Sequence, residues 1–171
     1  VALRDAAAVQ LRFGARRARA QTLVRVSNPP LPGGHGHSYS VVELITDDMP
    51  FLVDTLSLAL SEAGHSVQLI AHPIMSAVRG AGGRLLRFGE RHGAHAPANE
   101  SWQYLRIDRV AGTHEAEALQ ARLRAALADV RHACTDWPAM RQAARAVCTQ
   151  LRDRPPPFPS AVVRESAALL E

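Results

Sequence analysis

The pattern of apolar and polar positions is most regular between residues 41 and 64. A β-branched apolar run over residues 41–45 leads into two carboxylates and a proline, and apolar side chains then recur every three or four residues. The run has the composition of a buried strand, and the recurrence has the period of a helix. The sequence therefore predicts a strand, a tight acidic turn and a helix, with Gly64 ending that helix as a C′ residue.

The acidic turn carries Asp47, Asp48 and Pro50 at the predicted start of this helix. Negative charge is favoured at a helix N-terminus, and proline is tolerated in the first turn because its missing N–H has no partner there. We expect Asp48 to cap the helix or to lie just before it.

Alternating apolar segments elsewhere predict further strands, at residues 22–27, 65–71, 74–78, 84–88 and 102–110. Pro73 cannot donate to a strand ladder, so the strand around it should lie at an edge or bend. The last segment has apolar side chains on both faces, which indicates a sheet that is covered on both sides or meets a partner. Whether the segment at 22–27 joins the same sheet is left open.

Helical spacing recurs outside the central unit, at residues 1–20, 112–133, 137–151 and from residue 160 onward. Gly14 weakens the first of these helices, and residues 135–138 should separate the second from the third. Four prolines between Pro155 and Pro159 indicate a stiff boundary, and the pattern after them suggests the start of another domain.

Together these elements predict an α+β fold, a ferredoxin-like antiparallel sheet with helices on one face, plus an extra C-terminal helix. We divide the chain into a basic helix, short strand and loop at 1–38, a sheet domain with an appended helix at 39–151, and a proline-rich linker leading into a following domain at 152–171.

Positive charge is concentrated near the start of the chain. Residues 1–40 hold six arginines and one aspartate, a charge of +5, so the rest of a chain of net charge +4 carries −1. All 20 basic residues are arginine, which we attribute to coding bias. We interpret the arm as a solvated helix face or a contact within a larger protein and expect no nucleic-acid partner. No apolar run approaches the roughly 20 residues of a membrane span, so we expect no membrane partner.

Cysteines and histidines give no strong indication of a metal site. Cys134 and Cys148 fall in helical segments without disulfide or ligand spacing, which suggests a reducing cytoplasm. Two histidine pairs lie in loops, His35 with His37 and His92 with His95. They have no cysteine or carboxylate at ligand spacing, so we interpret them as solvated and expect no metal.

Residues 46–63 resemble the first strand, turn and helix of ACT domains, small regulatory modules of amino-acid metabolism. The turn of that family typically reads Asp-Arg-Pro-Gly-Leu-Leu, and its positions are occupied here by Asp48, Met49, Pro50, Phe51, Leu52 and Val53. Gly64 matches the glycine before the second strand of the family.

A longer text resembles the N-terminal region of the large bacterial NAD-specific glutamate dehydrogenases, at residues 41–54, 69–74, 100–102, 107–109, 128–131 and 136–140. The resemblance implies a multidomain, homo-oligomeric enzyme that uses NAD to convert glutamate to 2-oxoglutarate and ammonia. This chain has no lysine and no Gly-x-Gly-x-x-Gly after a strand. We therefore expect no catalytic or cofactor-binding residue in it, and contacts with other domains or subunits of the same enzyme.

The resemblance also implies a candidate site for a small amino-acid effector, made of Asp47, Asp48, Met49, Pro50, Phe51 and Leu52. The helix N-terminus would hold the effector's carboxylate, and Asp47 or Asp48 its ammonium group. Phe51 stands where many ACT domains keep glycine, so its ring would fill or block the pocket. In the alternative interpretation the two acids cap the helix and Phe51 packs in a domain interface.

Two functions follow from these observations. The first is a regulatory or architectural ACT-like domain of an NAD-dependent glutamate dehydrogenase, with the catalytic domain elsewhere. The alternative is an amino-acid-sensing ACT module of an unrelated regulatory protein.

Overall fold

The computed structural model describes residues 3–29, 39–89 and 98–169. Contacts within the chain divide it into two compact units, residues 1–130 and 131–171, which we call unit 1 and unit 2. The three predicted domain ranges stay a prediction.

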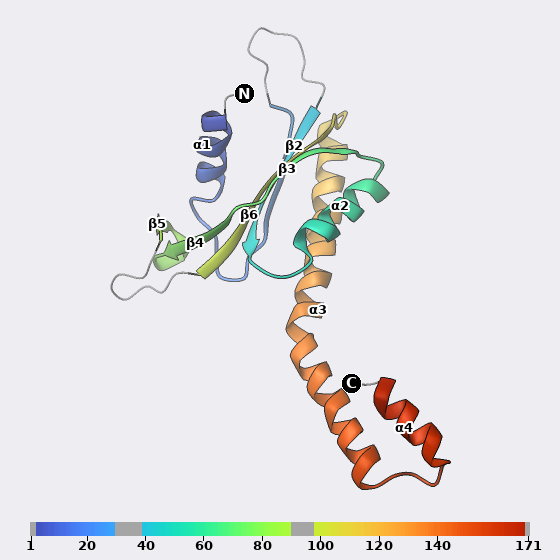
Figure 1. The fold of residues 1–171 in the computed structure, drawn as a ribbon. Helices are drawn as coiled ribbons and strands as arrows, with labels where there is room; N and C mark the ends of the chain where they lie inside the picture. Colours follow the sequence, from blue (N-terminus) through green and yellow to red (C-terminus); the bar gives the residue numbers. More distant parts are fainter. Residues whose placement is uncertain (1–2, 30–38, 90–97, 170–171) are drawn as a thin grey trace. The chain divides into compact units, whose positions relative to one another are not determined.

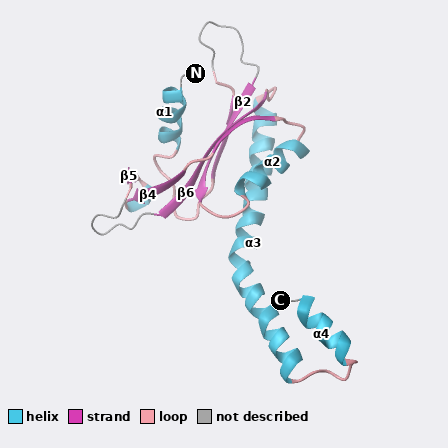
Figure 2. Cartoon of the chain, viewed as in Figure 1, coloured by secondary structure: helices cyan, strands magenta, loops and turns pink. Residues whose placement is uncertain are grey.

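Unit 1 is built on an antiparallel sheet of six strands (Figure 1, Figure 2). The strands are β1 (Leu23–Ser27), β2 (Tyr39–Asp47), β3 (Val67–Ala71), β4 (Ile74–Arg79), β5 (Leu85–Phe88) and β6 (Ala98–Asp108). Their order is β1-β2-β6-β4-β5, and β3 also pairs with β6. The predicted α+β class is confirmed, and the segment at 22–27 does join this sheet, where Val24 faces Leu44 of β2.

The long strand β6 pairs along one side with both β3 and β4. His72 and Pro73 separate these two short strands, since a proline has no N–H to donate. The Pro73 carbonyl still accepts a hydrogen bond from the Trp102 N–H at 3.0 Å. The expected interruption at Pro73 is therefore confirmed.

One face of the sheet carries the main core. Alternate side chains of the central strands point to this face, among them Val42 and Leu44 of β2 and Leu105 and Ile107 of β6. They pack against α2 (Leu52–Glu62) and the start of α3 (Thr113–Asp153). The helical spacing seen in the sequence supplies the covering residues, which are Leu52, Leu56, Ala59, Leu60, Leu119, Leu123 and Leu127.

The opposite face is covered by α1 (Leu3–Phe13), which lies across the sheet from α2 (Figure 1). The Gln10 side-chain amide donates to the Gln103 carbonyl at 2.9 Å, and the Arg25 guanidinium lies 4.5 Å from the centroid of the Phe13 ring. The two helices of the predicted sheet domain, α2 and α3, thus lie on one face as expected, and α1 covers the other face, which explains the apolar groups on both sides of β6.

The predicted capping of α2 is confirmed at one end of the helix but not at the other. At the C-terminus, the Gly64 N–H donates to the Ser61 carbonyl and the His65 N–H to the Leu60 carbonyl, both at 2.9 Å, and Gly64 has a φ of 82°. This is the predicted glycine cap. At the N-terminus the capping position is Phe51, which makes no side-chain cap hydrogen bond. Of the two positions expected for Asp48, the capping one is therefore wrong, and Asp48 lies before the helix, separated from the helical Leu52 by three residues.

The expected break at residues 135–138 is also wrong, because α3 is continuous from Thr113 to Asp153 with Pro138 inside it. An interior proline removes one helical hydrogen bond at a cost of about 3 kcal/mol. Strong helix formers, mainly alanine, leucine, arginine and glutamine, lie on both sides of Pro138 and keep the helix intact.

Unit 2 comprises residues 131–153 of α3 and the helix α4 (Ser160–Leu169). Cys148, Val163 and Ala167 are buried between these helices, and the Cys148 thiol lies 3.5 Å from the Ala167 carbonyl. Among the described helices, none is long and apolar enough to cross a membrane.

Candidate functional site

The residues of the predicted effector site are contiguous, but their side chains have different surroundings. Asp47 ends β2, is 35% exposed and forms an ion pair with the Arg17 guanidinium. Asp48 is exposed, and its backbone N–H donates to the Asn99 carbonyl at 3.0 Å. The two acids therefore differ in role, because only Asp47 is drawn into the fold by a buried cation.

The other four residues of the predicted site, Met49 to Leu52, also differ in how far they are buried. Met49 packs against the core and Leu52 is 2% exposed within it, whereas Pro50 lies at the surface. Phe51 is 68% exposed with a φ of 68°, the left-handed conformation that glycine adopts most readily. Its ring is not buried against any described part of the chain. The surface of the predicted site thus consists of Asp48, Pro50 and Phe51, with Asp47 partly exposed.

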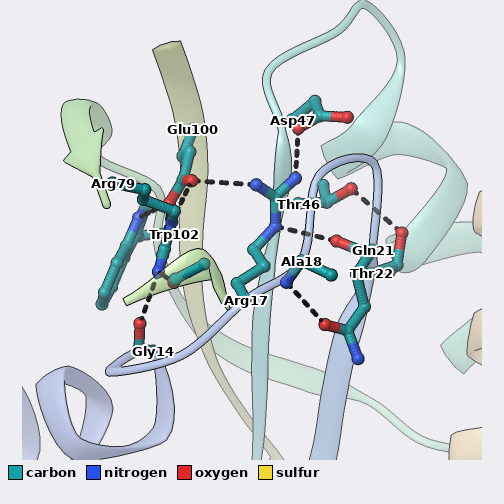
Figure 3. Close-up of polar contacts among 11 residues, drawn as sticks. Gly14, Arg17, Ala18, Gln21, Thr22, Thr46, Asp47, Arg79, Glu100 and Trp102 are labelled. Atoms are coloured by element: carbon teal, nitrogen blue, oxygen red, sulfur yellow. Dashed lines mark hydrogen bonds and ion pairs between the residues drawn. The ribbon is translucent and has the colours of Figure 1, made fainter. Parts of the chain in front are cut away.

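A buried polar cluster that sequence reasoning missed lies next to this turn (Figure 3). Arg17, which follows α1, is 3% exposed and reaches Glu100 at the start of β6, whose side chain is 1% exposed. Arg79 of β4 binds the same carboxylate. We call Arg17, Asp47, Arg79 and Glu100 the arginine network. It ties the segment after α1 to the ends of three strands.

Arg17 lies between the two acids of this network, as Figure 3 shows. Its Nη1 donates to Glu100 Oε1 at 2.8 Å, its Nη2 to Asp47 Oδ1, and its Nε to the Gln21 carbonyl at 2.8 Å. Each guanidinium nitrogen therefore has an acceptor, which is what a buried arginine requires.

Glu100 accepts four hydrogen bonds in the network. Besides the bond from Arg17, Arg79 donates through Nε to Oε1 at 2.6 Å and through Nη2 to Oε2 at 2.9 Å, and Trp102 Nε1 donates to Oε2 at 3.0 Å. Burial opposes ionisation of this carboxyl, but the Arg79 hydrogen bonds and the two arginine charges outweigh it, so the pKa of Glu100 is lowered.

Arg79 extends the network to the backbone. Its Nη1 donates to the Gly14 carbonyl at 3.0 Å and to the Gly83 carbonyl at 2.9 Å. A Cβ at Gly14 would lie 2.2 Å from the Trp102 ring, so only glycine allows this approach of the chain to the sheet. The Gly14 that weakens a helix in the sequence is therefore required for packing.

A recess of about 470 Å³ lies beside the network. It is lined by Arg17, Arg19, Asp47, Ala77, Arg79, Gly80, Gly83, Ala98 and Glu100. Asp47 therefore contributes to two features, the turn before α2 and the wall of this recess.

A second ion pair joins β1 to β2, between the partly exposed Arg25 and the buried Glu43. Arg25 Nε donates to Glu43 Oε2 at 2.7 Å, and the Glu43 side chain is 2% exposed. The pKa of Tyr104 on the adjacent strand is raised, mainly because the side chain is buried and to a smaller extent by the neighbouring Tyr39 and Glu43. Arg17 and Arg25 thus have partners inside the fold, so the arginine arm is not wholly a solvated face.

The two histidine pairs considered as metal ligands lie outside the described residues. Among the residues that the structure describes, no group of three or more histidine, cysteine, aspartate or glutamate side chains is placed to hold a metal ion.

The sequence did contain one signal for the buried acids. Glu43 lies within an apolar strand, where a carboxylate requires a cationic partner.

Comparison with known proteins gives a consistent result. A family model described as "Glutamate dehydrogenase, ACT1 domain" matches residues 2–123. A relative from Pseudomonas aeruginosa named NAD-specific glutamate dehydrogenase is 31% identical over 155 residues, covering 90% of this chain and 10% of the relative. One of the same name from Halomonas elongata is 32% identical over 151 residues, covering 86% of this chain and 9% of the relative.

The chain thus spans about a tenth of the length of these relatives. The match covers the whole sheet, α1, α2 and the start of α3, that is, nearly all of unit 1. It includes residues 46–63, the strand, turn and helix that resemble ACT domains, and it favours the dehydrogenase hypothesis over an unrelated regulator. The chain belongs to the family of glutamate dehydrogenase ACT1 domains.

Proposed function

We propose that this chain is a regulatory and architectural unit of a larger NAD-dependent glutamate dehydrogenase of the bacterial cytoplasm. The parent enzyme would convert glutamate to 2-oxoglutarate and ammonia and bind its NAD in another domain. The observation that carries this proposal is the ACT1 match across residues 2–123, together with relatives of that name of which the chain spans about a tenth.

The test uses the full-length parent enzyme. We would compare the wild type with an Arg17→Met variant, which loosens unit 1, and with Arg145→Ala, which changes an exposed arginine of unit 2. We expect glutamate-dependent reduction of NAD in all three, with an altered glutamate response or altered assembly in Arg17→Met alone. A parent without this activity would refute the proposal, as would an Arg17→Met enzyme indistinguishable from the wild type.

An effector site at the turn before α2 is the second part of the proposal. The capping residue Phe51 gives no side-chain hydrogen bond, so the first N–H groups of α2 are not capped by it. These groups and the helix dipole favour a carboxylate, and the exposed Asp48 in the turn before the helix would hold an ammonium group. An amino acid carries both charges.

Thermal unfolding with a panel of amino acids, including glutamate and aspartate, tests this site. An effector at 100 times its dissociation constant should stabilise the unit by about 2.7 kcal/mol, a shift of about 5 to 10 °C. Asp48→Asn and Phe51→Trp should abolish the shift, and Asp129→Asn, which changes an exposed acid of α3, should preserve it. A panel that gives no shift would refute effector binding and leave the architectural role.

Contacts with other domains or subunits are the third part. Large apolar side chains are exposed on both units, including Leu58 and Ile74 on unit 1 and Trp137 and Met140 on unit 2. Such surfaces are typical of a domain that packs against others. We expect a homo-oligomeric parent, and a monomeric mass for the parent in solution would contradict this expectation.

A further inference from the structure

The recess beside the arginine network has no role in the proposed function. Its walls come from the segment after α1, the end of β2, the strand β4 with the turn after it, and the start of β6. Four of its nine lining residues are alanine or glycine, so little side-chain volume fills the space above the guanidinium groups. The recess is therefore both roomy and charged.

Backbone contacts hold the glycine turn against this site. The Arg17 N–H donates to the Gly83 carbonyl at 3.0 Å, and Gly83 has a φ of 73°. A Cβ at Gly83 would come within 2.1 Å of the Arg17 carbonyl oxygen. Only glycine fits here, so the sequence fixes the wall of the recess on which Arg17 and Arg79 depend.

The buried Arg17 and the partly buried Arg79 retain unused donors. A guanidinium has five N–H groups. With the described residues, Arg17 makes three side-chain hydrogen bonds and Arg79 makes four, so three of their ten N–H groups have no acceptor in this part of the chain. Arg19 also lines the recess, and its side chain makes no hydrogen bond or ion pair with the described residues. Three arginines therefore line the recess, and each has N–H groups without an acceptor among the described residues.

The charge of the recess also favours an anion. Its lining carries three arginines and two acids, a sum of +1. Both acids are already engaged, since Glu100 accepts four hydrogen bonds and Asp47 is paired with Arg17. Two further exposed arginines, Arg16 and Arg84, are joined by a backbone bridge next to the lining residues. With these two arginines and with Asp48, the exposed acid next to Asp47, the local sum is +2.

We propose that this recess binds a small dianion whose charges sit on oxygen, as in a dicarboxylate or inorganic phosphate. Arginine suits such groups because its planar N–H pairs match two oxygens at once. Arg19 would supply the freely oriented guanidinium, and Arg17 and Arg79 a fixed positive floor. The site is distinct from the effector turn, where the free acid is Asp48, and the proposal does not depend on the activity of the parent enzyme.

Calorimetric titration of the chain with glutarate and with phosphate, at constant ionic strength, tests the site. Glutarate has no amino group, so it probes the recess rather than the ammonium-binding function proposed for Asp48. We expect saturable binding of at least one dianion. Loss of a charge-assisted hydrogen bond should weaken that binding by about tenfold or more in Arg19→Ala. The matched control Arg145→Ala removes the same charge from unit 2 and should bind as the wild type does.

The arms of the experiment separate the outcomes. Binding of glutarate but not phosphate would identify a dicarboxylate site, and the reverse a phosphate site, and either supports the proposal. Absence of binding by both, an equal response to chloride, or full affinity in Arg19→Ala would overturn it. None of these results bears on family membership, or on amino-acid binding that depends on Asp48, so the two proposals fail separately.

Discussion

Replacing Arg17 with methionine should lower the free energy of unfolding of unit 1 by about 3 kcal/mol. The side chain is 3% exposed and bonds to Glu100, Asp47 and the Gln21 carbonyl. Removing one partner of a buried ion pair costs about 3 to 5 kcal/mol, because the other charge stays buried without its partner. We expect the lower end of this range, since Glu100 keeps its hydrogen bonds from Arg79 and Trp102.

Urea unfolding followed by fluorescence measures this loss. Trp102 contacts the network through Glu100 and reports on unit 1, and a Trp137→Phe background removes the other tryptophan of the chain. With a denaturant slope of about 2 kcal/mol/M, the loss corresponds to a fall of about 1.5 M in the urea midpoint. Arg145→Met is the matched control, and its midpoint should stay near that of the reference protein.

A loss below about 1 kcal/mol would refute the reasoning, because it is the value expected for a solvent-exposed ion pair. A double-mutant cycle sharpens the test. If Arg17 acts through the buried carboxylate, Arg17→Met and Glu100→Gln together should cost less than the sum of the two single changes. Additive losses would show that Arg17 contributes by packing alone.

Three further outcomes follow from single positions. Phe51→Gly should stabilise unit 1 by about 0.5 to 1 kcal/mol in urea unfolding, because Phe51 is left-handed and exposed, and a loss would contradict this. Gly14→Ala should lower the free energy of unfolding by about 1 to 3 kcal/mol, because the new methyl group would clash with Trp102. Gly112→Ala is the control and should change the free energy of unfolding little, since the space around Gly112 is open. Equal effects of the two substitutions would refute the packing argument. Because the pKa of Glu100 is lower in the folded state, its ionised carboxylate stabilises the fold when the pH is above 4.5, the ordinary pKa of this carboxyl. This stabilisation is lost as the pH falls through the lower folded-state pKa. Urea midpoints measured from pH 7 to 3 should therefore fall less steeply in Glu100→Gln, and identical slopes would exclude this cause.

The parts of the fold that local chemistry determines could be predicted from the sequence. Residues 41–64 combine a β-branched run, helical spacing and a terminal glycine, and each signal acts within a few residues. The structure has β2, α2 and a Gly64 cap at these places. Pro73 likewise separates two strands because its missing N–H is a property of that residue alone.

Features that depend on distant partners could not be predicted in this way. Arg17 and Glu100 are 83 residues apart, and no local pattern relates them. The placement of α1 on the opposite face depends on Gly14, which has no side chain and so can lie against Trp102. The sequence shows the glycine but not that Trp102 is its neighbour in the fold. Pro138 shows the opposite error, since a strong local signal was outweighed by helix formers on both sides.

Asp47 belongs to both proposed sites, and this decides which residue is the better probe of each. Its carboxylate accepts a hydrogen bond from the buried Arg17, and Asp47 is also the last residue of β2 before the turn to α2. A change at Asp47 would therefore disturb the arginine network and the effector turn together, and neither function could be assigned from it. Asp48 is exposed and touches the network only through the chain, whereas Arg19 lines the recess and lies outside the turn. Substitutions at these two positions separate effector binding from anion binding because each leaves the Asp47–Arg17 pair intact.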